Sequence, residues 1–105
     1  MPTLPAGSIR HTVAFTPKHA EGSREEADFL AAGAALGSLP GVEAFEVLRE
    51  VSPKNGFRYG FSMVFADRGA YEGYNNHPDH VAFVRDRWDA EIENFLEIDY
   101  EVHPS

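Results

Sequence analysis

The stretch Tyr74-Asn-Asn-His-Pro-Asp-His-Val-Ala-Phe83 places a phenol, two imidazoles and a carboxylate within seven residues before the chain turns apolar. Because the residue before a proline is disfavoured in the helical region, a helix that carries Tyr74 should end near His77. Proline suits the first turn of a helix, so Pro78 should begin a second one. The stretch therefore predicts two helices with a tight break between them. Tyr74 lies in the last turn of the first helix and His80 in the first turn of the second.

Helical patterns lie on both sides of this break. Asp67 is a favourable N-cap residue and should begin the first helix. Residues 81–96 should form a longer helix, with an inner side made of Val84, Trp88, Ile92 and Phe95 or Leu96. The capping box of residues 23–26 should begin an earlier helix with a buried face of Ala27, Leu30, Ala34 and Gly37. The Pro40-Gly41 pair should end that helix, and we expect a positive φ at Gly41.

Four other segments show the period-two alternation of β-strands, and they are residues 9–15, 42–51, 59–65 and 98–102. The resulting order is β-α-β-β-(short α)-α-β. This order predicts an α+β protein with a ferredoxin-like, four-stranded antiparallel sheet and helices on one face. We expect a flexible N-terminal arm at residues 1–8 and a single domain at residues 9–105.

The two faces of this sheet differ in character. One face carries aromatic side chains and should pack against the helices. The other is small and partly apolar, with Thr12, Ala14, Ala44, Leu48, Ser62 and Val64. A chain of this length has no further element to cover that second face. We therefore expect a homodimer formed through the sheet face that carries Thr12, Ala14, Leu48 and Val64.

Composition excludes several classes of function. The 105 residues include no cysteine, so disulfides and thiolate chemistry are excluded. Nine basic and seventeen acidic residues give a net charge of −8, which argues against nucleic acid as a partner. No apolar run approaches the ~20 residues of a membrane span, so we expect no membrane partner. The first residues do not resemble a signal peptide, and the expected location is the cytoplasm.

Tyr74 and His80 are the residues whose chemistry stands out. A phenol and an imidazole on neighbouring helix ends form a plausible proton-transfer pair if they converge on one space. The alternative is that both are packed or solvated side chains without a catalytic role. A metal site through His77 and His80, assisted by Asp79, would need a third protein ligand that the sequence does not supply.

Five segments, in this order, resemble a known family. They are Ile-Arg-His-Thr-Val-Ala-Phe at residues 9–15, Leu-Pro-Gly-Val at 39–42, Glu-Val-Leu-Arg-Glu-Val-Ser at 46–52, Tyr-x-x-His-Pro-x-His at 74–80 and Asp-Tyr at 99–100. Together they resemble the stress-responsive A/B barrel domain (Dabb) family of dimeric α+β barrel proteins. The resemblance implies a homodimer in which two sheets face each other. It also implies a cavity in each subunit between the sheet and the helices.

A characterised branch of that family, olivetolic acid cyclase, is a polyketide cyclase that uses no cofactor. The resemblance places its catalytic tyrosine and histidine on Tyr74 and His80. It further implies that the substrate is bound by His11, Val13, Phe15, Phe45, Phe61, Met63, His77 and Phe83. The implied chemistry is proton abstraction followed by aldol- or Claisen-type ring closure, or a related lyase or isomerase reaction, without cofactor or metal. Asn75 replaces an apolar residue of that cyclase, and the region after His80 is one residue longer, so the same substrate is not expected.

Two alternatives to this enzymatic function belong to other functional classes. In the first, the chain is a non-catalytic, ligand-binding or stress-protective homodimer, and His11, Tyr59 and Tyr74 are core residues with satisfied hydrogen bonds. A cavity that touches both Tyr74 and His80 would favour the enzyme over this reading. In the second, the same barrel degrades haem or is a cofactor-free monooxygenase, which rests only on the presence of Asn75, His80 and Trp88.

Overall fold

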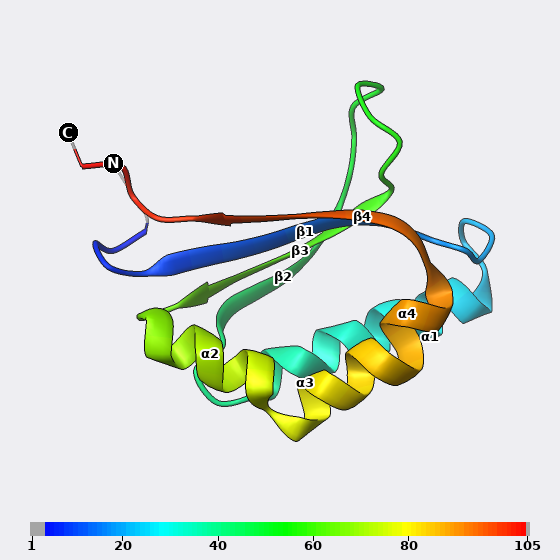
Figure 1. Cartoon of the computed structure of the whole chain (residues 1–105). Helices are drawn as coiled ribbons and strands as arrows, with labels where there is room; N and C mark the ends of the chain where they lie inside the picture. The colour runs from blue at the N-terminus through cyan, green and yellow to red at the C-terminus, as the bar shows by residue number, and fades with distance from the viewer. Residues whose placement is uncertain (1–3, 105) are drawn as a thin grey trace.

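The computed structural model describes residues 4–104 as one sheet and one layer of helices (Figure 1). In chain order the elements are β1 (Ile9–Pro17), α1 (Arg24–Ala34), the 3-10 helix η1 (Ala35–Ser38), β2 (Glu43–Arg49), β3 (Tyr59–Phe65), α2 (Arg68–Asn76), α3 (Pro78–Phe83), the π-helical turn η2 (Val84–Trp88), α4 (Asp89–Glu91) and β4 (Ile92–Tyr100). Residues 1–3 of the predicted N-terminal arm lie outside the described residues, and Ser8 at the end of that arm is buried.

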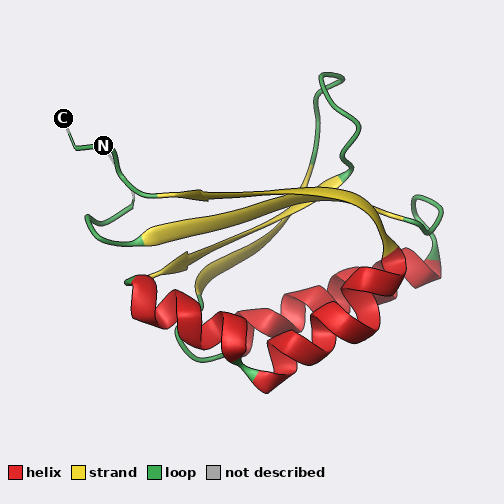
Figure 2. Cartoon of the chain, viewed as in Figure 1, coloured by secondary structure: helices red, strands yellow, loops and turns green. Residues whose placement is uncertain are grey.

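The four strands pair antiparallel in the order β2-β3-β1-β4, and the helices cover one face of the sheet (Figure 2). This is the ferredoxin-like fold, so the predicted fold class is confirmed. In register, His11 lies opposite Met63 and Val13 opposite Phe61. Paired residues in an antiparallel ladder point to the same face, so these side chains form one row on the helix side of the sheet.

Local backbone chemistry sets most of the helix boundaries. The Ser23 hydroxyl accepts from the Glu26 amide at the start of α1, and the Asp67 carboxylate accepts from the Ala70 amide at the start of α2. His77 has an extended backbone and is followed by Pro78 at the first position of α3, as predicted. Gly41 has a φ of +84°, which confirms the expected left-handed conformation after the helix stop.

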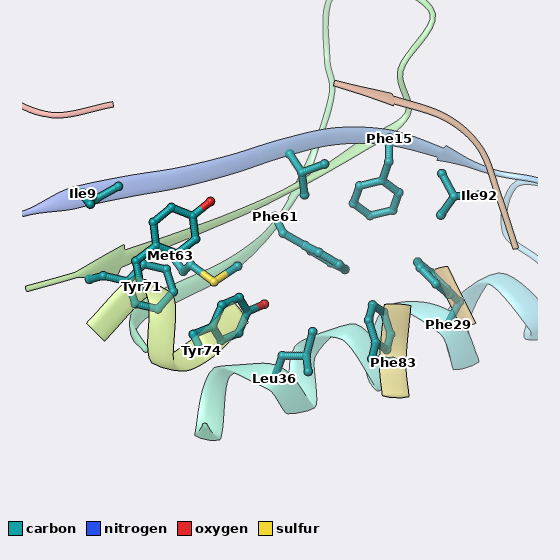
Figure 3. Packing of buried hydrophobic residues seen from close by; sticks show 12 residues of the cluster. Ile9, Phe15, Phe29, Leu36, Phe61, Met63, Tyr71, Tyr74, Phe83 and Ile92 are labelled. Carbon is teal, nitrogen blue, oxygen red and sulfur yellow. The ribbon is translucent and has the colours of Figure 1, made fainter. Parts of the chain in front are cut away.

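The core is aromatic, and Figure 3 shows it between the sheet and the helices. Phe15, Phe29 and Phe65 are fully buried. Phe61 packs at 4.6 Å from Phe15 between ring centroids. A Cβ built on Gly33 of α1 would lie only 2.4 Å from the tip of the Phe61 ring, so this glycine permits the helix to approach the sheet.

The buried face of α1 differs from the predicted one. Ala27 and Ala34 are exposed, and the buried residues of the helix are Glu26, Phe29 and Gly33. The helix is rotated in this way because Phe29 has far more apolar surface to bury than an alanine. Burial of the Glu26 carboxylate is possible because it accepts hydrogen bonds from the Gly22 amide, the Tyr59 hydroxyl and the Arg58 guanidinium.

The predicted long helix at residues 81–96 is wrong beyond Glu91. The chain leaves α4 at Ile92 and continues as β4 along the edge of β1, with Phe95 opposite Phe15. The predicted fourth strand therefore begins six residues earlier than residue 98 and ends at Tyr100, before Val102. The free edge of β1 offers this segment a row of backbone hydrogen bonds, and that long-range pairing outweighs the helical pattern.

The sheet face away from the helices is partly apolar and uncovered. Thr12, Ala14 and Val64 lie on it and are half-buried. Four larger apolar side chains accompany them, with exposed fractions of 45% for Leu48, 50% for Leu96, 39% for Ile98 and 51% for Tyr100. Among residues 4–104, no helix has the length and apolar character needed to cross a membrane.

Candidate functional site

A cavity of about 300 Å³ lies between the inner face of the sheet and the layer formed by η1, α2, α3 and η2. Its lining combines aromatic and apolar side chains with five ionisable ones. The lining residues are His11, Val13, Leu36, Phe61, Met63, Tyr74, His80, Phe83, Val84, Trp88, Asp89, Phe95 and Glu97. Apolar walls with a few convergent polar groups are typical of a small-molecule site.

Tyr74 comes from the last turns of α2 and is 2% exposed. Its ring packs 5.1 Å from Phe65 between centroids, and its hydroxyl points into the layer between the sheet and the helices (Figure 3). Within the described part of the chain, that hydroxyl has no hydrogen-bond partner, although it borders the cavity. Burial, and then the negative charge of Glu97, raise the pKa of the Tyr74 phenol. The group therefore stays protonated at neutral pH and is available as a donor.

His80 lies in the first turn of α3, with its ring centroid 4.4 Å from that of Tyr74. Its Nδ1 donates to the Asn75 carbonyl at 3.1 Å. Because a carbonyl only accepts, Nδ1 carries the proton and Nε2 has the free lone pair. Burial is the main cause that lowers the pKa of His80, so the ring is neutral at pH 7. A neutral imidazole of this tautomer can accept a proton at Nε2.

A second polar cluster joins the sheet to α2 beside the cavity. His11 Nδ1 donates to one oxygen of Asp99 at 2.6 Å, and the Tyr71 hydroxyl donates to the other at 2.7 Å. The Tyr71 oxygen also lies 2.9 Å from His11 Nδ1. Burial and the Asp99 carboxylate raise the pKa of Tyr71. The Asp99 carboxylate and the Tyr71 hydroxyl thus hold the His11 ring in a fixed orientation on the cavity wall.

The structure places most of the expected site residues around one space. Besides Tyr74 and His80, the lining includes His11, Val13, Phe61, Met63 and Phe83. Three expected residues lie outside it. Phe15 is fully buried behind Phe61, and Phe45 packs 5.4 Å from the same ring on its far side. His77 instead caps α3, where its Nδ1 accepts from the Asp79 amide.

Six lining residues were not expected, namely Leu36, Val84, Trp88, Asp89, Phe95 and Glu97. The helical pattern predicts Trp88 and Phe95 on the inner side of one helix, but they meet across the helix-to-strand junction with ring centroids 5.5 Å apart. Glu97 had no assigned role. The alternation of Leu96, Ile98 and Tyr100 with Glu97 and Asp99 is the signal that could have found it, because it places Glu97 on the inner face of β4.

The hypothesis of a metal site concerns His77 and His80, with Asp79 assisting. In residues 4–104, no three His, Cys, Asp or Glu side chains are grouped so that they could hold a metal ion. His77 and His80 each use Nδ1 for a contact with the backbone. Each ring therefore has one nitrogen engaged at the break between α2 and α3.

Comparison with protein families agrees with this architecture. The model of the stress responsive A/B barrel domain (Dabb) family matches residues 9–102. The chain belongs to this family. No curated protein sequence matches the chain.

Solved structures of similar proteins extend the comparison. A Dabb family protein with a ferredoxin-like fold from Mesorhizobium loti is 58% identical, with a TM-score of 0.91 over 93% of this chain and 99% of that one. A dimeric ferredoxin-like protein of unknown function from Jannaschia sp. is 25% identical, with a TM-score of 0.72 over 91% of this chain and 100% of that one. A hydroxynitrile lyase from Passiflora edulis is 17% identical, with a TM-score of 0.80 over 96% of this chain and 98% of that one. The similarity to the Passiflora edulis protein is a similarity of fold.

Proposed function

We propose that this chain is a cofactor-independent enzyme that abstracts a proton next to a carbonyl group of a small aromatic or polyketide-like molecule. The observation that carries the proposal is the pairing of Tyr74 and His80 on one cavity. The phenol is protonated and lacks a partner among the described residues, and the neighbouring imidazole is neutral with Nε2 free. A donor and a base 4.4 Å apart between ring centroids suit enolate chemistry.

In the proposed reaction, Nε2 of His80 takes the proton from the carbon beside the carbonyl. The C–H electron pair forms the carbon–carbon double bond of an enolate, and the negative charge moves to the carbonyl oxygen. Tyr74 donates a hydrogen bond to that oxygen and stabilises the charge as it develops. Attack of the enolate carbon on a second carbonyl of the same molecule would close a ring. This step breaks the π bond of that carbonyl and leaves an alkoxide, which takes the proton held by His80. In the reverse direction the same groups would support a lyase reaction.

The protein fold is compatible with such chemistry. The Passiflora edulis protein of the same fold is a hydroxynitrile lyase. Aromatic and apolar side chains make up much of the cavity lining, and the burial of Tyr74 strengthens its electrostatic effect on a bound carbonyl. A site of about 300 Å³ fits a ligand with one or two rings.

Exchange of a carbon-bound proton for solvent deuterium tests the proposal without knowledge of the natural substrate. Acetophenone and benzoylacetone serve as probes, and exchange is followed by NMR. Wild-type protein should accelerate exchange, His80→Ala should abolish the acceleration, and Tyr74→Phe should lower it by about 10²–10³. His103→Ala, in the exposed segment after β4, is the matched control for His80→Ala and should behave as wild type. Binding of the probes without any acceleration would favour the non-catalytic, ligand-binding function instead.

We also propose that the functional unit is a homodimer formed through the outer sheet face. Leu48, Leu96, Ile98 and Tyr100 expose apolar surface there, beside Thr12, Ala14 and Val64. Contiguous exposed apolar surface of this kind marks an interaction site. The similar protein from Jannaschia sp. is described as dimeric, which supports the proposal.

A further inference from the structure

The ionisable groups on the cavity wall carry no fixed positive charge. Among the described residues, the lining includes the carboxylates of Asp89 and Glu97 but no lysine or arginine. The chain as a whole has a net charge of −8. A ligand that approaches this cavity therefore meets a negative potential, which disfavours anions and favours cations.

Glu97 is placed at the mouth of the cavity by the register of the sheet. It lies opposite Val13 in the pairing of β4 with β1, so both side chains point to the helix side. Val13 is buried on the cavity wall, whereas Glu97 is exposed. A side chain that lines the cavity and also reaches solvent stands where a ligand must pass.

The carboxylates at this mouth are not neutralised by neighbours. Within residues 4–104, neither Asp89 nor Glu97 forms a side-chain hydrogen bond or ion pair, whereas the nearby Glu91 pairs with Arg87. The charge of Glu97 extends into the site, because after burial it is the next cause that raises the pKa of Tyr74. Two free carboxylates thus face a cavity that also presents the unpartnered hydroxyl of Tyr74, a residue that is 2% exposed.

The walls next to these carboxylates are aromatic. Phe61, Phe83, Trp88 and Phe95 all line the cavity, and Trp88 meets Phe95 edge to face at 5.5 Å between centroids. Aromatic faces attract cations through the negative charge of the π-system, and tryptophan does so most strongly. Aromatic rings beside carboxylates form a site suited to an organic ammonium group.

We propose that the cavity selects an aromatic ligand that carries a positively charged nitrogen, and that Glu97 is the residue responsible for this selection. The proposal names the substrate class for the site of Tyr74 and His80, and in that sense it rests on the proposed function. The ligand ring packs against Phe61 and Phe83. Its ammonium group lies at the mouth beside Glu97, with the face of Trp88 next to it.

Three probes of nearly equal shape separate charge from size: 2-phenylethylammonium, 2-phenylethanol and phenylacetate, with charges of +1, 0 and −1 at neutral pH. Trp88 is the single tryptophan of the chain, so its fluorescence reports binding directly. Wild-type protein should bind the cation most tightly and the anion most weakly, with dissociation constants that differ on the order of tenfold. Added salt should reduce this difference.

Glu97→Gln keeps the shape of the side chain and removes its charge. In this variant the cation and the anion should bind within about threefold of each other, while the affinity for the neutral probe stays unchanged and shows that the cavity is intact. Asp89→Asn should change the ranking in the same direction. Glu101→Gln, beyond the end of β4, is the control and should keep the wild-type ranking. Equal binding of the three probes by wild type, tightest binding of the anion, an unchanged ranking in Glu97→Gln, or no binding at all would overturn the proposal.

The same titrations with Tyr74→Phe and His80→Ala separate this inference from the proposed reaction. Both variants should retain the preference for the cation, because neither changes the carboxylates at the mouth. If deuterium exchange shows no catalysis but the charge ranking holds, the proposed reaction fails and the ligand class stands. If exchange is catalysed but charge has no effect on binding, the ligand class fails alone.

Discussion

Gly33 and Gly73 allow the same substitution to be compared in two structural settings. Both lie inside helices, Gly33 in α1 and Gly73 in α2, so replacement by alanine should raise helix propensity by about 1 kcal/mol at either site. A Cβ at Gly73 would meet nothing within 4 Å. A Cβ at Gly33 would lie 2.4 Å from Phe61 Cζ and 2.8 Å from Cε2. The environments therefore predict that Gly73→Ala stabilises the protein, whereas Gly33→Ala gains no stability or loses some.

The size of the effect at Gly33 follows from these distances. Ordinary carbon contacts begin at 3.4 Å, so Phe61 Cζ would have to retreat by the difference between 3.4 and 2.4 Å, about 1 Å. The ring is 3% exposed and is held by Phe15 and Phe45, so it cannot turn freely. Overpacking of a well-packed core costs about 1–3 kcal/mol. After the gain in propensity, Gly33→Ala should range from nearly neutral to about 2 kcal/mol less stable than wild type.

Urea unfolding of the wild type and the two variants measures this directly. Gly73→Ala should be stabilised by up to about 1 kcal/mol, and the two variants should differ by at least about 1 kcal/mol, or roughly 4 °C in melting temperature. Because Phe61 also lines the cavity, Gly33→Ala should weaken the binding of 2-phenylethanol while Gly73→Ala leaves it unchanged. Equal stabilisation by both alanines would show that Phe61 yields easily, and the packing argument would be wrong.

Two further predictions concern pH and assembly. Burial lowers the pKa of His80, so the unfolded chain takes up a proton at this residue before the folded protein does. The stability that neutral His80 contributes is fully present above the pKa of the unfolded chain, about 6.5. It is lost as the pH falls towards the lower pKa that His80 has in the folded protein. His80→Gln should therefore lose less stability than wild type between about pH 7 and pH 5 in urea unfolding, and parallel curves would contradict this. Leu96→Glu on the outer sheet face should give a monomer in sedimentation, whereas wild type and the loop variant Val51→Glu sediment as dimers. A monomeric wild type at micromolar concentration would refute the assembly.

The sequence alone predicts the features that depend on short-range backbone chemistry. Pro78 excludes His77 from a helix wherever the segment lies, so the break between α2 and α3 is visible without a structure. Neighbouring residues also determine the N-caps at Ser23 and Asp67 and the left-handed conformation of Gly41. These restrictions act within a few residues, and they place Tyr74 and His80 on either side of one break.

Alternation alone places β3 at Tyr59–Phe65, the same residues that the pattern predicts. A strand buried on one face must repeat every second residue, and no helical pattern competes in that segment. The aromatic row of the sheet, and with it His11, Val13, Phe61 and Met63 on the cavity wall, follows from the same rule. The substrate-binding roles of these residues were inferred from the resemblance to the family, because the alternation pattern does not indicate them.

Only the tertiary structure decides where the last helix ends. The apolar residues Trp88, Ile92 and Phe95 fit a helical period, and a strand period fits part of the same segment. The choice depends on the free edge of β1, whose residues lie at least 75 positions before their partners in β4 and pair with that strand from Ile92 onwards. A local pattern contains no information about a partner at that distance, because the strand is stabilised by its backbone hydrogen bonds to β1.

The polar contacts of the site also depend on the pairing of distant strands. His11 and Asp99 are 88 residues apart and meet because β1 and β4 are neighbours in register, and Tyr71 reaches both from α2. Glu97 becomes part of the cavity wall only once β4 is aligned with β1. The sequence determined which residues flank the helix break, because proline and capping restrict the backbone locally. The tertiary structure decided which distant side chains share the cavity, because strand pairing sets their register.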